Sequence, residues 1–322
     1  MAELAPGLVT IFGGSGFVGT QVARAMARRG WRVRIAVRKP ALAYELRMTG
    51  DVGQVQLSRC DINNPEDVAM ALKGADVAIN LVGILFETGG RKFQAMHVDG
   101  ARNIAQAATA AGVKQLVHVS AIGADADSKA LYARTKGEGE AAVRAAFPNA
   151  IVVRPSVIFG SEDGFLNRFA NMAARMPVMP LVAGETRMQP VHVTDVAEAI
   201  SRLATDNRYG GETFELGGPA VWTMKEIIDY VLSETGRDRL VLPLPSVAAR
   251  AIASLAQIPA VVGLTPALTV DQVKLLDNDN VVADGAKGFA DLGMEPTGMK
   301  AVAEGYLWRY RDGGQYAAQI AG

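Results

Sequence analysis

Short runs of β-branched and other apolar residues alternate with longer alanine-rich stretches through the first half of the chain. Apolar runs of about four to eight residues predict strands, and the longer stretches between them predict helices. We predict strands at Leu8–Phe12, Trp31–Val37, Gln54–Arg59, Val77–Asn80, Gln115–Ser120 and Ala150–Arg154. Strands that alternate with helices in this way form a parallel sheet with helices on both faces. The pattern therefore predicts a doubly wound α/β fold.

Glycines mark the ends of two predicted helices. The helix Phe17–Arg29 is followed by Gly30, and the helix Phe93–Ala111 is followed by Gly112. Glycine is common at this place because the residue after a helix often takes a left-handed backbone conformation. Both helices therefore have well-marked ends.

The alternation loosens beyond Phe159. The stretch GSEDGF predicts a loop, and the proline-containing stretch MPVMPLVAGE, residues 176–185, predicts a connector. Thr223 and Glu226 stand at capping-box spacing, which indicates a helix N-terminus. The elements predicted here are helices at Leu166–Arg175, Thr194–Thr205 and Thr223–Thr235, and short strands at Gln189–Val193 and Thr213–Leu216. The second half is therefore predicted to form a smaller α/β lobe.

Composition predicts a folded protein that meets a partner or a membrane surface. Of the 322 residues, 49% are apolar and 20% are charged, which argues against a disordered chain. The positive mean hydropathy is high for a protein surrounded only by water. The 33 basic residues balance the 33 acidic ones, so no net field attracts the whole molecule to nucleic acid. We therefore expect no nucleic-acid partner.

Cysteine usage and the start of the chain predict a cytoplasmic protein. Cys60 is the only cysteine, so the chain has no internal disulfide and no cluster of thiols for a metal. The stretch MAELAPGLVTIFGG has no signal-peptide or presequence pattern. We expect a reducing compartment and no metal.

An apolar segment follows in the second half, at Pro243–Leu268. Arg250 is its one charged residue, and its prolines keep it below the roughly 20 uninterrupted apolar residues that a membrane span needs. It is predicted to be either an ordinary core helix or an exposed docking surface.

A glycine loop indicates the first chemistry. The strand Leu8–Phe12 runs directly into Gly13, Gly16 and Gly19, and a helix follows. The first glycine permits a tight turn, the second lets backbone amides approach a pyrophosphate, and the third lets the helix pack closely on the strand. Free amides at the start of that helix then favour an anion. The sequence therefore predicts a Rossmann-type dinucleotide site.

The end of the second strand indicates which dinucleotide. Enzymes that prefer NAD place an acid about 20 residues beyond the glycines, where it binds the ribose 2′-hydroxyl. This chain has no acid between Glu3 and Glu45, and the strand ends in Arg38 and Lys39. Charge-assisted bonds from these cations to a 2′-phosphate would favour NADP(H). The alternative is that both side chains only solvate the strand end.

Tyr132 and Lys136 form the candidate acid/base pair. They stand four residues apart on one face of a predicted helix. A tyrosine that transfers a proton at neutral pH must lose about three pKa units, and a nearby ammonium group lowers the pKa in that direction. Such a pair also occurs by chance on solvated helices.

In this order along the chain, the glycine loop, the Tyr132–Lys136 pair and Arg154-Pro155 resemble the extended and atypical short-chain dehydrogenase/reductase superfamily. The resemblance implies that Asp61 and Ile62 lie by the adenine, that the loop after the fourth strand lines the cofactor, and that the segment from Pro155 borders the nicotinamide. It implies cofactor contacts for Gly13, Ser15, Gly16, Phe17, Val18, Arg38, Lys39, Asp61, Ile62, Leu81, Val82, Gly83, Val119, Tyr132, Lys136, Pro155, Val157 and Ile158. We expect residues 1–160, completed by part of 186–220, to form the NADP(H)-binding domain. Residues 161–322 would form a C-terminal lobe with a substrate-like pocket or a docking surface.

The chain departs from this superfamily at the substrate oxygen. Its enzymes place a second hydroxyl one or two positions past the first serine after the fifth strand, where this chain has Ala121 and Ile122. Ser120 is the nearest hydroxyl, and it is as suited to a cofactor or backbone contact as to catalysis. The oxygen-binding half of a catalytic site is therefore incomplete in the sequence.

Three longer stretches resemble the NADPH-binding accessory subunits of respiratory complex I and their bacterial relatives. They are FPNAIVVRPSVIFGSEDGFLNRFANM, LTVDQVKLLDNDNVV and LGMEPTGMKAVAEGYLWRYR. The resemblance implies a structural NADPH, little or no turnover, complex I subunits as partners, and a peripheral place on the cytoplasmic face of the inner membrane. The alternative is an active NADP-dependent reductase, epimerase or dehydratase in which Tyr132 is the acid/base and Lys136 tunes it. A regulator that senses NADPH/NADP⁺ has no support beyond the fold.

Overall fold

The computed structural model describes residues 3–256 and 269–316 and divides the chain into two compact units. The first unit consists of residues 1–155, 193–216 and 284–294. The second consists of residues 156–192, 217–283 and 295–322.

A seven-stranded sheet forms the centre of the first unit, in the order β11-β6-β5-β4-β1-β2-β3. Every neighbouring pair in it is parallel. Its strands are β1 (Leu8–Phe12), β2 (Arg32–Val37), β3 (Val55–Arg59), β4 (Val77–Asn80), β5 (Gln115–Val119), β6 (Ile151–Pro155) and β11 (Thr213–Leu216). The predicted doubly wound fold is confirmed. The central strands are apolar throughout because helices cover both sides of a parallel sheet.

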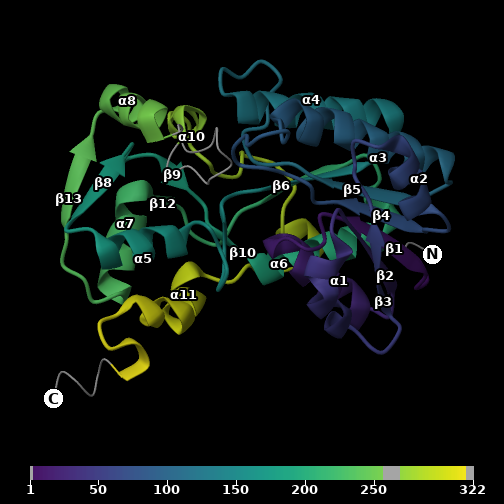
Figure 1. The fold of residues 1–322 in the computed structure, drawn as a ribbon, viewed down its shortest axis with the longest axis horizontal. Coiled ribbons are helices and arrows are strands. Elements are labelled where there is room, and N and C mark those ends of the chain that lie inside the picture. Colours follow the sequence, from purple (N-terminus) through teal and green to yellow (C-terminus); the bar gives the residue numbers. More distant parts are fainter. Residues whose placement is uncertain (1–2, 257–268, 317–322) are drawn as a thin grey trace. The chain divides into compact units, whose positions relative to one another are not determined.

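Helices form a layer on each side of this sheet (Figure 1). One layer contains α2 (Pro65–Leu72), α3 (Gly100–Ala110) and α4 (Leu131–Ala146), and the other contains α1 (Phe17–Arg28) and α6 (Val193–Thr205). Leu72, Ile104 and Val143 from the first layer pack into one apolar core with sheet residues. Short helical turns complete the unit: η1 (Pro40–Thr49), the π-helical turn η2 (Gln94–Asp99) before α3, η3 (Asn207–Tyr209) and η4 (Ala290–Leu292).

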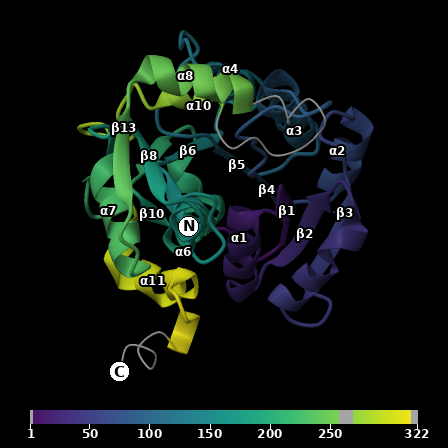
Figure 2. The ribbon, with the colours of Figure 1, turned by 60° about the vertical axis from the view of Figure 1, so that its left-hand side comes forward.

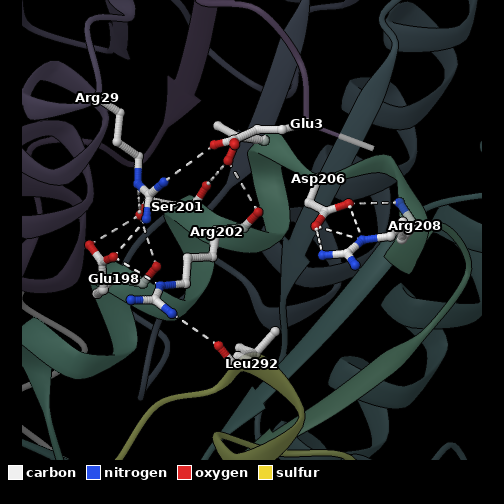
Figure 3. A network of polar contacts seen from close by, with 9 residues as sticks. Glu3, Arg29, Glu198, Ser201, Arg202, Asp206, Arg208 and Leu292 are labelled. Carbon is white, nitrogen blue, oxygen red and sulfur yellow. Dashed lines mark hydrogen bonds and ion pairs between the residues drawn. The ribbon is translucent and has the colours of Figure 1, made fainter. Parts of the chain in front are cut away.

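Arg29, at the C-terminal end of α1, joins this helix to α6 (Figure 3). Its guanidinium donates to Glu198 Oε1 at 2.6 Å and to Ser201 Oγ at 3.0 Å, and lies 3.8 Å from a carboxylate oxygen of Glu3. Arg202 also donates to Glu198 Oε1, at 3.1 Å, and reaches the backbone of η4. The network therefore ties the returning segments 193–216 and 284–294 to the first 155 residues.

The second unit combines three small two-stranded sheets with helices. Its strands pair as β7 (Ile158–Phe159) with β10 (Val191–His192), β8 (Val178–Val182) with β13 (Leu240–Leu244), and β9 (Arg187–Met188) with β12 (Trp222–Thr223). Its helices are α5 (Leu166–Arg175), α7 (Met224–Glu234), α8 (Ser246–Ala256), α10 (Val270–Leu275), α11 (Met299–Leu307) and the short turns η5 (Trp308–Tyr310) and η6 (Gly314–Tyr316). The helices α5, α7 and α11 share an apolar core, and α8 lies beside α10 (Figure 2). The predicted smaller α/β lobe is confirmed.

Two predictions in this half need correction. The stretch 176–185 is not a connector, because Val178–Val182 forms β8. The single strand predicted at Gln189–Val193 is divided: Val191–His192 forms β10, and α6 begins at Val193. The apolar segment Pro243–Leu268 supplies the end of β13 and then α8, where Ala249 and Ala253 are buried but Val247 is exposed. Its remaining residues, 257–268, lie outside the described residues.

Within residues 3–256 and 269–316, no helix is both long enough and apolar enough to cross a bilayer.

Candidate functional site

The carboxyl ends of the parallel strands collect the predicted cofactor residues at one edge of the sheet. The chain reverses direction across the sheet at β1, which lies between β4 and β2. In open α/β sheets, ligands bind at the carboxyl edge of such a switch point. The residues that follow β1, β2, β3, β4, β5 and β6 at this edge include Gly13, Arg38, Asp61, Leu81 and Ser120, with Pro155 ending β6.

The glycine loop has the geometry that a pyrophosphate site needs. Gly13 has a positive φ of 77°, and a Cβ on it would lie 3.0 Å from the backbone of Leu81. A Cβ on Gly19 would lie 2.3 Å from the Gly13 carbonyl oxygen, so only glycine fits. Gly16 is the N-cap of α1 and has no side chain to cover the first amides. The first amides of α1, which include those of Phe17 and Val18, have no side-chain cap and follow the exposed Ser15, so they are available to an anion.

Most of the residues predicted to lie by the adenosine and its ribose are exposed to solvent. Arg38 and Lys39 directly follow β2 and are both exposed. Asp61 follows β3 and is exposed, and its carboxylate accepts the amide of Asn63 at 3.0 Å. Ile62 is buried in the core under this edge.

The loop after β4, residues 81–84, is fixed by Asn80, which the family resemblance included in this loop, and by two histidines that the sequence did not single out. The Val82 amide donates to Asn80 Oδ1 at 3.0 Å. The side-chain nitrogen of Asn80, Nδ2, lies 3.1 Å from His118 Nδ1. The Ile84 amide donates to His97 Nε2 at 3.1 Å, and His97 Nδ1 lies 3.0 Å from Thr135 Oγ1 on α4. These bonds fix neutral tautomers for both histidines.

The electrostatics of the two histidines agree with these bonds. Burial, assisted by the Lys136 charge, lowers the pKa of both His97 and His118 to about 3. They are therefore neutral at physiological pH. His97 in particular joins the loop after β4 to α4, the helix that carries the Tyr132–Lys136 pair.

Tyr132 and Lys136 lie on α4, as predicted. The Tyr132 ring makes edge contacts with His97 at 5.4 Å and with Phe93 at 5.9 Å between centroids. Burial raises the pKa of Tyr132 to about 12. Burial also lowers the pKa of Lys136 to about 8, against the opposing effect of Glu140, and Lys136 Nζ donates to the Val119 carbonyl at 3.1 Å. At neutral pH the phenol is therefore a proton donor and the amine remains largely charged.

Two buried polar atoms on β5 and directly after it lack a hydrogen-bond partner among the described residues. Among the described residues, Ser120 Oγ and His118 Nε2 are buried and have no hydrogen-bond partner. Buried polar atoms without partners are costly, so each one calls for a ligand, a water or another explanation. The hydroxyl of Ser120 is a suitable donor to a ligand oxygen.

A buried ion network behind α4 was also missed by the sequence analysis. Arg154 on β6 donates to both oxygens of Glu140, at 2.9 and 2.7 Å, and reaches Glu215 on β11 at 3.4 Å. The only signal was the position of Glu140, four residues after Lys136, on the same helical face. This network gives the buried Lys136 charge a nearby negative partner.

Val157 and Ile158, predicted to border the nicotinamide, belong to the second unit. The Val157 amide donates to Asn280 Oδ1 at 3.1 Å, and the Val157 carbonyl accepts from Val191 at 3.0 Å. Both residues are thus held in place within their own unit.

The residues of the first unit suit a dinucleotide. They provide glycine positions that a Cβ would obstruct, uncovered helix amides, two exposed cations after β2 and an unpaired buried hydroxyl. When bound, a nicotinamide cofactor would supply hydride chemistry. The chain itself supplies a phenol, an ammonium group and Ser120, with Ala121 and Ile122 where a second hydroxyl would stand.

Comparisons with known proteins agree with this geometry. The model of the NAD dependent epimerase/dehydratase family matches residues 9–217. The mitochondrial NADH-ubiquinone oxidoreductase 40 kDa subunit of Neurospora crassa is 32% identical over 307 residues, which span 95% of this chain and 80% of the relative. A ceramide reductase of Caulobacter vibrioides is 38% identical over 197 residues, 61% of each chain. Among solved structures, the Escherichia coli NADPH-dependent quinone oxidoreductase QOR2, complexed with NADPH, has a TM-score of 0.74 at 21% identity, covering 93% of this chain and 99% of its own.

Proposed function

Because this chain belongs to the NAD dependent epimerase/dehydratase family, on the branch that includes the 40 kDa subunit of NADH-ubiquinone oxidoreductase, we propose that it binds NADP(H) mainly as a structural cofactor and assembles with respiratory complex I. The resemblance predicted from the sequence is thereby confirmed, and the chain has an NAD(P)-binding fold. The observation that carries the structural role is the missing second hydroxyl beyond Ser120, where the chain has Ala121 and Ile122. Burial also raises the pKa of Tyr132 to about 12, opposite to the shift that an acid/base tyrosine needs.

The preference for NADP(H) rests on Arg38 and Lys39. Both are exposed after β2, where the ribose of a dinucleotide would lie, and no acid stands there to bind a 2′-hydroxyl. Each charge-assisted bond to a 2′-phosphate contributes about 1.5–3 kcal/mol. The variant Arg38→Gln/Lys39→Gln should therefore lose about tenfold or more in NADPH affinity and keep its NADH affinity. Equal losses for both nucleotides would reject the preference.

Assembly is tested in membranes. We propose a peripheral place on the cytoplasmic face of the inner membrane, supported by the 32% identity to a subunit of NADH-ubiquinone oxidoreductase. A tagged copy should migrate with NADH:quinone oxidoreductase activity on blue-native electrophoresis of mildly solubilised membranes. A low-mass species free of that activity would reject this function. A Gly19→Ala variant, which should not hold the dinucleotide, tells whether assembly needs the cofactor.

A second candidate function is an NADP-dependent reductase, epimerase or dehydratase. It is favoured by the unpaired, buried Ser120 hydroxyl near the end of β5 and by the intact Tyr132–Lys136 pair. In that case Tyr132→Phe should reduce turnover of a carbonyl substrate by orders of magnitude. Tyr44→Phe is the matched control, because Tyr44 is 57% exposed. In the structural role, Tyr132→Phe should retain both NADPH binding and assembly.

A further inference from the structure

The first unit carries a local excess of positive charge. Residues 17–59, which run from α1 to the end of β3, contain nine basic residues and two acidic ones, whereas the whole chain has 33 of each. The charge that is balanced over the chain is therefore uneven along it. An excess of this kind attracts a negatively charged partner to one side of the molecule.

Three arginines of this segment are available to such a partner. Arg24, Arg28 and Arg47 are exposed, and none of them forms an ion pair with another residue that the structure describes. Arg24 and Arg28 stand four residues apart, on the outer face of α1. All three are distinct from Arg38 and Lys39, which the proposed function assigns to the 2′-phosphate of the cofactor.

Apolar side chains protrude from the same segment. Leu42 and Met48 on η1 are 79% and 81% exposed, and Val52 in the turn that follows is fully exposed. Ala43 and Leu46 of η1 are buried instead. Side chains that protrude to this degree line no groove, so a partner that removes them from water must surround them. The boundary between the headgroups and the acyl chains of a bilayer can do so.

Hydrogen bonds hold the turn that carries Val52 against the end of α1. Gln54 Nε2 donates to the Ala27 carbonyl at 2.7 Å, and Gln54 Oε1 accepts the amide of Asp51 at 2.8 Å. The turn η1 itself packs against α1 and β3. Val52 therefore lies beside the end of α1, where Arg28 follows Ala27, and the backbone of this turn is fixed before any contact is made.

Tyr44 and Arg47 place an aromatic ring and a cation together on η1. The guanidinium carbon of Arg47 lies 5.0 Å from the centroid of the Tyr44 ring, which is 57% exposed. Single exposed apolar residues or single cations are ordinary features of a surface. Here both kinds gather on one fixed stretch, and this combination is what peripheral membrane contacts use, because cations attract anionic headgroups while apolar side chains insert.

We propose that the first unit binds an anionic lipid bilayer through one surface. The residues of this surface, called the basic surface below, are Arg24, Arg28, Leu42, Arg47, Met48 and Val52. The arginines contact lipid phosphates, and the apolar side chains enter the boundary between headgroups and acyl chains. The proposal rests on the peripheral membrane place proposed above and names the surface that makes the contact.

The test uses the purified full chain loaded with NADPH and flotation with lipid vesicles. Vesicles of phosphatidylcholine with one third phosphatidylglycerol are compared with vesicles of phosphatidylcholine alone, at low and at high salt. We expect binding to the anionic vesicles that falls at high salt, and little binding to the neutral ones. Arg24→Gln/Arg28→Gln/Arg47→Gln should weaken binding about 100-fold, since each cation near the surface contributes about fivefold.

The matched control for this variant removes the same charge elsewhere. Arg91→Gln/Arg175→Gln/Lys300→Gln changes three other exposed cations and should bind the anionic vesicles like the parent. Equal losses in the two variants would mean that net charge alone attracts the vesicles, and would overturn the basic surface.

The apolar part of the surface has its own test. Met48→Ser/Val52→Ser keeps the charge and should weaken binding about tenfold or more. Its control is Met70→Ser/Val247→Ser, because these side chains are 75% and 78% exposed, and it should bind like the parent. A loss in the control without a loss in Met48→Ser/Val52→Ser would place the contact elsewhere and overturn the proposal.

The remaining outcomes separate this surface from the proposed assembly with complex I. Absence of flotation with anionic vesicles, or equal flotation with neutral ones, would overturn the lipid contact. If the parent does not float and the arginine variant also fails to migrate with the complex on blue-native electrophoresis, the surface binds an acidic protein instead. A parent that migrates with the complex but does not float rejects this surface alone, and a parent that floats but does not migrate with it rejects the assembly alone.

Discussion

Acidification should destabilise the first unit through its two buried histidines, well before its carboxylates are protonated. His97 and His118 have folded-state pKa values of about 3, against an ordinary value of about 6.5 for an exposed histidine. Each therefore stays neutral in the folded chain while it takes up a proton in the unfolded chain. Because the unfolded state binds more protons between pH 6.5 and pH 3, the free energy of unfolding falls as pH falls through that window.

The magnitude follows from the two pKa values. Between pH 7 and pH 5, each histidine should remove about 2 kcal/mol of stability, and both together about 4 kcal/mol. This is a large share of the roughly 5–15 kcal/mol that stabilises a typical domain. Carboxylates titrate mostly below pH 5, so this interval isolates the histidines.

The assay is urea unfolding at pH 7, 6 and 5, followed by the fluorescence of Trp31, which is buried in the first unit. Trp222 and Trp308 are first replaced by phenylalanine so that the signal reports this unit alone. In His97→Asn and in His118→Asn the loss of stability between pH 7 and pH 5 should shrink by about 2 kcal/mol, whatever each variant's stability at pH 7. If both variants lost as much stability on acidification as the parent, the reasoning would be refuted.

Three further predictions concern packing, charge and capping. Gly19→Ala should destabilise the first unit by about 1–3 kcal/mol and abolish NADPH binding. The control is Gly305→Ala on α11, where a Cβ would meet nothing within 4 Å, and it should be neutral or slightly stabilising in thermal unfolding. Glu140→Gln should cost about 3 kcal/mol in urea unfolding because it leaves Arg154 without its main partner, and adding Arg154→Met should recover most of that loss. Thr223→Ala should cost the second unit about 1 kcal/mol by removing the N-cap of α7, and unchanged melting would contradict the capping box.

The strands of the parallel sheet could be predicted from the sequence because a strand buried on both faces must be almost continuously apolar. Those of the second unit could not. The stretch Val178–Val182 contains Pro180 and its partner strand contains Pro243, and proline usually argues against a strand. In a two-stranded sheet each strand has one edge without a partner strand. A proline whose nitrogen faces that edge therefore removes no hydrogen bond between the two strands.

The candidate site divides in a similar way. The glycine loop and the Tyr132–Lys136 pair are local patterns, so spacing alone predicts them. The contact between His97 and Thr135 joins residues 38 positions apart and depends on the π-helical turn before α3. A local pattern contains no signal for such a contact. The same holds for Arg154 and Glu215, which meet only because β6 pairs with β11.

The charge of Lys136 agrees with the proposed binding of an anionic cofactor. His97 and His118 are neutral, so Lys136 is the only cation among these three side chains. Glu140, whose two oxygens are bonded by Arg154, favours that charge against the effect of burial. Lys136 therefore remains largely charged at neutral pH, while burial raises the pKa of Tyr132 to about 12. An ammonium group, uncovered helix amides and a fixed backbone loop would together attract the phosphates of a dinucleotide, and this attraction is independent of any turnover of a substrate.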